Sequence, residues 1–89
     1  LVEERFYLYD DKEDTKTRFV SFLGESQRFD LAITSSQRFY GKQLVLDLQG
    51  NNFAIIGPDD LAEEGYIEYA FRLTAEQAEE LISFLSEII

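Results

Sequence analysis

The 89-residue chain contains no histidine and no cysteine, and it also lacks methionine and tryptophan. Imidazole and thiolate groups carry most side-chain catalysis at neutral pH and supply the ligands of most transition-metal sites. Their absence argues against ordinary enzyme chemistry and against such metal centres. Serine, lysine and carboxylate mechanisms remain open, but no recognisable constellation of these residues is present. We therefore predict a non-catalytic protein with no cofactor and no catalytic residue.

Long apolar runs are also missing, since no stretch approaches the roughly 20 residues that a membrane helix needs. The amino end does not show the basic-then-apolar pattern of a signal peptide. Because small secreted domains commonly depend on disulfides, a cysteine-free chain of this size is expected in the cytoplasm. Without methionine, Leu1 cannot be the first translated residue, so we expect further residues before it.

The length predicts a single domain over residues 1–89, able to bury about 60 to 65% of its unfolded surface. Eight phenylalanines and five tyrosines supply apolar side chains for a core, and one proline and five glycines argue against disorder. The net charge is −10, with seven Lys or Arg and eight Asp or Glu in residues 1–42, against one and ten in residues 43–89. This acidity argues against direct binding of nucleic acid or membranes.

Alternating apolar and polar residues recur in short runs and predict an antiparallel sheet. The predicted strands are residues 5–9 (the weakest), 16–23, 28–34, 43–48, 53–56 and 66–73. In the fourth of these, Leu44, Leu46 and Leu48 share one side, and Asp47 indicates that the opposite side is wet. Residues 49–52 are rich in amino acids that tolerate positive φ, so a tight hairpin turn is expected there.

The period changes in residues 74–89, where an apolar stripe recurs at helical spacing. The stripe consists of Ala78, Leu81, Ile82, Leu85, Ile88 and Ile89. Thr74 and Gln77 have the spacing of a capping box, and Pro58 could open a single helical turn through Leu61 and Ala62. The predicted fold class is α+β, an antiparallel meander-like sheet of five or six strands with one C-terminal amphipathic helix packed on one face.

One helix can cover only one face of such a sheet, and the opposite face is predicted to carry large apolar side chains. The candidate interface residues are Tyr7, Tyr9, Val20, Phe22, Val45, Ile56 and Tyr66. A twofold partner packed on them would cover this face, so a homodimer is expected. The alternative is that these side chains are scattered singly and partly wet, which is normal for a protein surface.

Residues 26–29 and 36–39 both read Ser-Gln-Arg-Phe. The structural interpretation is that the two copies lie near opposite ends of one strand. The functional alternative is a small patch that binds a carboxylate or phosphate through bidentate and stacking contacts. Its candidate residues are Arg28, Arg38, Phe39, Tyr40 and Lys42. The spaced glycines of a phosphate loop are missing, so a nucleotide site is not indicated.

Two acidic runs, in residues 10–14 and 59–64, could ligate calcium or magnesium, but neither has EF-hand spacing. We interpret both as solvated loops and predict no metal site. The favoured function is protein association through a homodimer with an acidic surface, with an unidentified protein partner also possible. Two alternatives stay open: a sensor of small anions or phosphorylated ligands that uses residues 38–42, and an acidic decoy for a nucleic-acid-binding protein.

Several segments are distinctive as a set, among them residues 5–11, 15–22, 38–42 and 53–57. On these segments the chain resembles, over nearly its whole length, a family of small cytosolic proteins of Bacillus-like and Staphylococcus-like bacteria that is classed as a domain of unknown function. The resemblance implies a bacterial cytosolic protein. It brings no activity, ligand or catalytic residue to assign to positions of this sequence.

Overall fold

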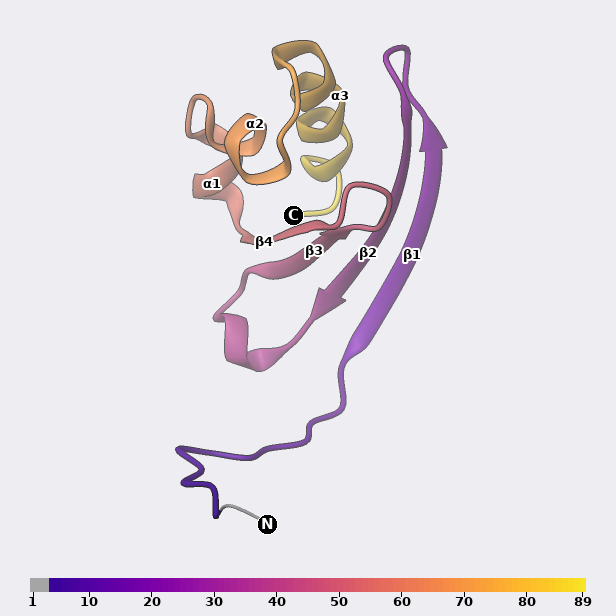
Figure 1. The fold of residues 1–89 in the computed structure, drawn as a ribbon. Helices are drawn as coiled ribbons and strands as arrows, with labels where there is room; N and C mark the ends of the chain where they lie inside the picture. Colours follow the sequence, from indigo (N-terminus) through magenta and orange to yellow (C-terminus); the bar gives the residue numbers. More distant parts are fainter. Residues whose placement is uncertain (1–3) are drawn as a thin grey trace.

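Four antiparallel strands form one sheet in the computed structural model, which describes residues 4–89 (Figure 1). The strands are β1 (Lys16–Leu23), β2 (Arg28–Ser35), β3 (Gln43–Asp47) and β4 (Asn52–Ile56). Each strand pairs with the next along the chain, in the order β1-β2-β3-β4. The predicted antiparallel meander is therefore confirmed, and the expected hairpin between the third and fourth strands is present, with Asn51 at a φ of 57°.

The predicted count of five or six strands is wrong for residues 4–89, because two of the expected strands are not strands. Residues 5–9 pair with no other strand. The segment predicted as the last strand forms the helix α2 (Tyr66–Phe71), bounded by Gly65 and Arg72 in the left-handed region. Ile67 and Phe71 are four residues apart and both buried, as helical spacing requires, whereas Tyr69 between them is 85% exposed.

Two further helices lie on the same side of the sheet as α2 (Figure 1). The short helix α1 (Pro58–Ala62) begins at the proline, as predicted. The C-terminal helix α3 (Ala75–Leu85) begins at the predicted capping box, in which the Thr74 Oγ1 accepts from the Gln77 N–H at 3.2 Å and the Gln77 Oε1 accepts from the Thr74 N–H at 3.0 Å. The helix ends four residues before the predicted boundary.

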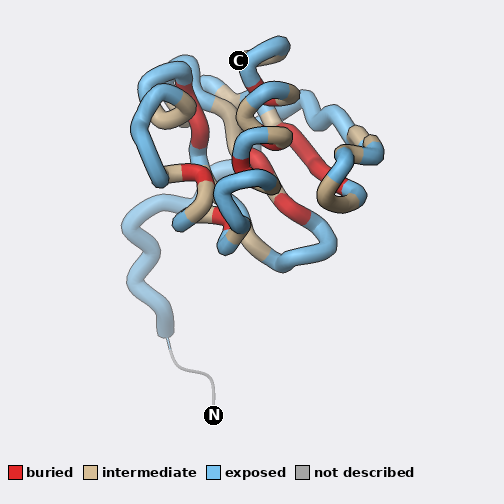
Figure 2. Tube along the Cα trace, turned by 90° about the horizontal axis from the view of Figure 1, so that it is seen from above, coloured by how far each residue is buried: buried red, intermediate tan, exposed pale blue. Residues whose placement is uncertain are grey.

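The core lies between the sheet and the three helices, as the buried segments in Figure 2 show. We call the side of the sheet that faces the helices the inner face. Strand residues on the inner face alternate along each strand and meet the apolar stripe of α3 and the buried side of α2. The buried core residues are Phe29, Leu31, Ile33, Val45, Ile56, Ile67, Phe71, Ala78, Leu81 and Leu85. The predicted covering of one sheet face by the C-terminal helix is confirmed.

The orientation of β3 is the reverse of the prediction. Val45 is fully buried and pairs with Ile33, whereas Leu44 and Leu46 point to the opposite side of the sheet. Asp47 lies on the inner face and is only 8% exposed. Its carboxylate accepts from the Gly50 N–H at 3.2 Å. Asp47 therefore stabilises the hairpin turn and does not indicate a solvent-exposed face.

Residues 4–15 precede the sheet, and we call them the N-terminal arm. The arm leads into the start of β1, and its amino-terminal part extends away from both the sheet and the helices (Figures 1 and 2). All its side chains are exposed, and they include the large apolar groups of Phe6 and Leu8. The domain therefore has two parts: a packed body and a projecting segment with aromatic side chains.

Candidate functional site

The basic and aromatic residues of the second Ser-Gln-Arg-Phe copy lie in the connection between β2 and β3. A short 3₁₀ helix, η1 (Gln37–Phe39), begins at Ser36, whose Oγ accepts from the Arg38 N–H at 3.2 Å. Tyr40 ends it with a φ of 52° and has an exposed ring. The first copy, residues 26–29, overlaps the start of β2, and the second copy follows the end of β2, so the two copies flank this strand as predicted. Arg28 and Arg38 are therefore separated by the length of β2.

Arg38 is engaged with the N-terminal arm. Its guanidinium lies 3.5 Å from the Asp11 carboxylate and 3.7 Å from the Glu13 carboxylate, and its Cζ lies 5.4 Å from the centre of the Tyr9 ring. Ser36 also donates its hydroxyl to Glu13. These contacts place two carboxylates on the cation that was expected to bind an anion, and they hold the base of the arm beside η1.

Lys42 is also paired, through a 3.0 Å contact between its Nζ and the Asp60 carboxylate at the start of α1. The pKa of Lys42 is raised above its ordinary value, mainly by the hydrogen bond to Asp60 and by the charge of the same carboxylate. The pKa of Asp60 is lowered, first because the Gly57 N–H donates to it at 2.8 Å and then because of Lys42. The ion pair ties the β2–β3 connection to α1.

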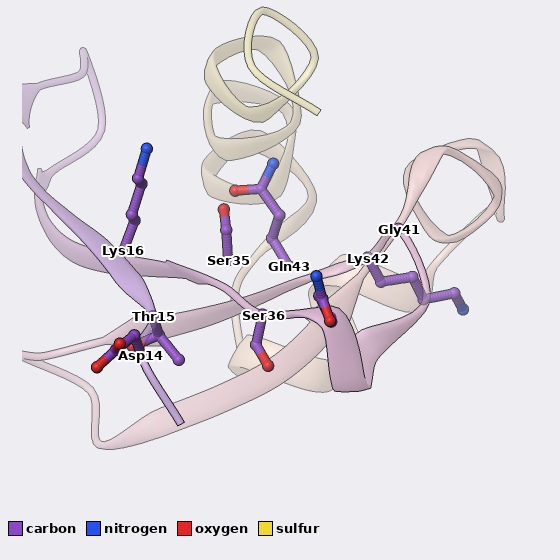
Figure 3. Close-up of a pocket in the computed structure, with 9 residues that line it drawn as sticks. Asp14, Thr15, Lys16, Ser35, Ser36, Gly41, Lys42 and Gln43 are labelled. Atoms are coloured by element: carbon purple, nitrogen blue, oxygen red, sulfur yellow. The ribbon is translucent and has the colours of Figure 1, made fainter. Parts of the chain in front are cut away.

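A shallow pocket of about 390 Å³ lies beside this connection and is drawn in Figure 3. It is lined by Asp14, Thr15, Lys16, Ser35, Ser36, Gln37, Gly41, Lys42 and Gln43. The two lysine side chains point in different directions, and Asp14 adds a negative charge at the rim (Figure 3). Of the candidate anion contacts, only Lys42 lines the pocket, so the structure does not gather Arg28, Arg38 and Lys42 around one cavity.

Five of the seven predicted interface residues lie on the inner side of the fold. Val45 and Ile56 are fully buried, and Val20, Phe22 and Tyr66 pack against the core. Their assignment to the uncovered face is therefore wrong. The strands β1, β3 and β4 carry apolar side chains on both sides, and the helices cover the side that was predicted to be open. Tyr66 belongs to the helix α2 and not to a strand. The remaining two, Tyr7 and Tyr9, are exposed on the N-terminal arm.

The uncovered side of the sheet, which we call the outer face, carries a different apolar set. Its apolar members are Phe19, Leu23, Ala32, Leu44, Leu46, Phe53 and Ile55. One row crosses all four strands in register, from Phe19 through Ala32 and Leu46 to Phe53. The two phenylalanines that end this row are 75% and 68% exposed. A continuous apolar row that ends in two exposed aromatic rings is the signal that identifies this surface.

The outer face is nearly neutral although the chain carries a charge of −10. Among the strand positions that point to this side, the charged residues are Arg28 and Asp30, which form an ion pair at 3.1 Å. Ser21 donates its hydroxyl to Asp30, and this bond together with Arg28 lowers the pKa of Asp30. By contrast, the helical side exposes many carboxylates: Asp59, Glu63, Glu64, Glu76, Glu79 and Glu87. The fold thus separates an apolar face from an acidic one.

The acidic residues do not assemble into a metal site in the part of the chain that the structure describes, where no three carboxylates converge. Within residues 4–89 no helix has the length and apolarity needed to cross a membrane.

Comparison with known proteins places most of the chain in one family. Residues 8–87 match the family described as SAV0927-like, whose name comes from a Staphylococcus aureus protein and states no activity, substrate or partner. A search of the curated proteins finds no match. The sequence motifs indicated a family of Bacillus-like and Staphylococcus-like bacteria, and the match agrees with the staphylococcal part of that prediction. The chain belongs to the SAV0927-like family.

Proposed function

We propose that this protein is a non-catalytic association module that forms a homodimer through the outer face of its sheet, in the cytoplasm. The observation that supports the proposal is the apolar row that crosses all four strands from Phe19 to Phe53, because it leaves the phenylalanine rings of the two edge strands largely in water. Burial of such rings is strongly favourable, at roughly 25 cal/mol for each Å² of apolar surface removed from water.

The distribution of charge supports a second copy of the same chain as the partner. Two molecules with a charge of −10 repel each other in most relative orientations. Two outer faces can approach without this repulsion, because the opposite charges of Arg28 and Asp30 neutralise each other within each copy. A twofold dimer formed there would turn the acidic helices of both copies outward, away from each other. The carboxylates on α1 and α3 would then form the two outer surfaces of the dimer.

The test is the mass of the protein in solution, measured by sedimentation equilibrium over a wide range of concentration. The expected mass rises from 10.3 kDa toward twice that value. Phe53→Ala removes an outer-face ring from each copy, so at about 2 kcal/mol per copy we expect dissociation to become roughly 10³-fold easier. Tyr69→Ala is the matched control, because this ring is also largely exposed but lies on the helical side. A monomeric mass at every concentration would refute the proposal.

The acidic helical side gives a second candidate, a decoy for a nucleic-acid-binding protein, supported by the exposed carboxylates on α1 and α3. Such a decoy would co-purify with a basic protein from its host, and the complex would dissociate as salt is added. The small-anion sensor has less support, because Arg38 and Lys42 are already paired with carboxylates. A phosphorylated compound that raised the melting temperature of the wild type, but not of Arg38→Ala, would favour the sensor.

A further inference from the structure

The outer face alone is small for a stable dimer. Four strands of five to eight residues, about 4.8 Å apart and rising about 3.3 Å per residue, present a projected area of roughly 400 Å². A specific interface commonly buries about 800 Å² on each partner. A dimer built on this face therefore needs further surface from each copy.

The N-terminal arm carries surface of the required kind. Four consecutive residues, Phe6 to Tyr9, have large apolar side chains, and Phe6 and Leu8 are almost completely exposed. An aromatic side chain can bury about 150 to 250 Å², so covering half of the exposed surface of these four residues adds roughly 300 to 400 Å² per copy. Outer face and arm together reach the area of an ordinary interface.

The base of the arm is held in a position that directs it away from its own outer face. Arg38 contacts Tyr9, Asp11 and Glu13 beside η1, and residues 4–8 project beyond the end of the sheet (Figure 1). The seven residue-to-residue steps from Glu13 back to Phe6 span about 23 Å when extended, more than the width of a four-stranded sheet at about 4.8 Å per strand. The arm is thus long enough to cross the outer face of another molecule when Tyr9 and Asp11 leave Arg38 and the arm stays anchored at Glu13, which also accepts from Ser36.

We infer that two copies exchange their N-terminal arms, each laying Phe6 to Tyr9 on the outer face of the other. This inference rests on the proposed dimer and names the second component of its interface. In an extended arm, Phe6 and Leu8 lie on one side and Tyr7 and Tyr9 on the other. One pair can therefore contact the partner's phenylalanines while the other pair covers the opposite side of the arm.

Disulfide trapping tests the exchange directly, because the chain has no cysteine of its own. Leu8→Cys places a thiol on the arm, and Thr34→Cys places one in the second strand on the outer face. When the two single variants are mixed under mild oxidation, exchange predicts a covalent heterodimer. Ser83→Cys, exposed on α3 on the acidic side, is the control partner and should not link to Leu8→Cys.

Sedimentation of the double variant Phe6→Ser, Leu8→Ser supplies the second measurement, with a dimer expected to dissociate about 10- to 100-fold more easily. These side chains make no core contact, so folding should be unchanged. A dimer that is unaffected by this variant and gives no Leu8–Thr34 cross-link overturns the exchange but leaves the outer-face dimer standing. An intramolecular disulfide in a monomeric Leu8→Cys, Thr34→Cys protein overturns both, since the arm would then cover its own sheet. A wild type that stays monomeric likewise overturns both.

Discussion

Two neighbouring residues of β3 test which face of the sheet is the core. Val45 is 0% exposed between Ile33 and Ala54, whereas Leu46 lies on the outer face between Ala32 and Phe53. Val45→Ala removes two methyl groups worth about 0.8 kcal/mol each and leaves a cavity. We therefore expect it to lower the free energy of unfolding by about 2 to 3 kcal/mol, a large part of the roughly 4 to 13 kcal/mol available to a domain of this size.

Leu46→Ala removes a larger side chain, but one that already contacts water. At low protein concentration, where the chain is monomeric, the expected loss is about 1 kcal/mol or less. With a urea dependence near 1 kcal/mol per molar, the unfolding midpoint should fall by about 2 to 3 M for Val45→Ala and by about 1 M or less for Leu46→Ala. Circular dichroism during urea titration measures both midpoints.

Comparing the losses of stability caused by Val45→Ala and Leu46→Ala shows which side of β3 faces the core. If Leu46→Ala destabilised the protein more than Val45→Ala at low concentration, the helices would have to lie on the leucine side of β3, and the outer face described above would not exist. Repeating the titration at high concentration separates folding from association. There the wild type should gain stability from the dimer, and Leu46→Ala should gain less.

Three further changes test local features of the fold. Thr74→Ala removes the side-chain cap of α3 and should lower the free energy of unfolding by about 1 kcal/mol, while Thr74→Ser should retain most of it. Glu80→Ala removes the carboxylate that accepts from the Ser26 N–H at 2.7 Å and should increase hydrogen exchange at that amide about tenfold. Asp60 has a lowered pKa because the Gly57 N–H donates to it, so its contribution to stability is present above the unfolded pKa near 4 and is lost as pH falls through the folded value. Asp60→Asn should therefore flatten the acid side of the stability profile, as followed by thermal unfolding, and an unchanged profile would contradict the assignment.

Some elements could be predicted from the sequence because one local signal dominates. Residues 16–23 were predicted and found as a strand, since the β-favouring residues Thr17, Phe19, Val20 and Phe22 are concentrated there between turn-forming clusters. The start of α3 was correct because Thr74 and Gln77 bond to each other's backbone amides, a contact that depends on nothing outside the first turn of the helix. The hairpin between β3 and β4 was correct because the turn requires a positive φ that Asn51 tolerates.

The existence of the candidate site could be predicted from the sequence, but most of its residues could not. An uncovered sheet face was expected and is present, but its residues were assigned to the wrong side in β1, β3 and β4. The error arose because both sides of β3 are apolar and because Asp47 was interpreted as a marker of solvent. A charged residue at the end of a strand can instead be satisfied by a turn amide, and no property of the strand itself distinguishes the two cases.

The sequence by itself determined the absence of imidazole and thiol chemistry, the concentration of negative charge in the second half, and the amphipathic C-terminal helix. These features follow from composition and from contacts within a few residues. Only the tertiary structure decided that residues 66–71 are helical and that Val45 faces the core while Leu46 faces outward. A six-residue segment can satisfy both a helical and a strand period, and a strand that is apolar on both sides takes its orientation from whatever packs against it.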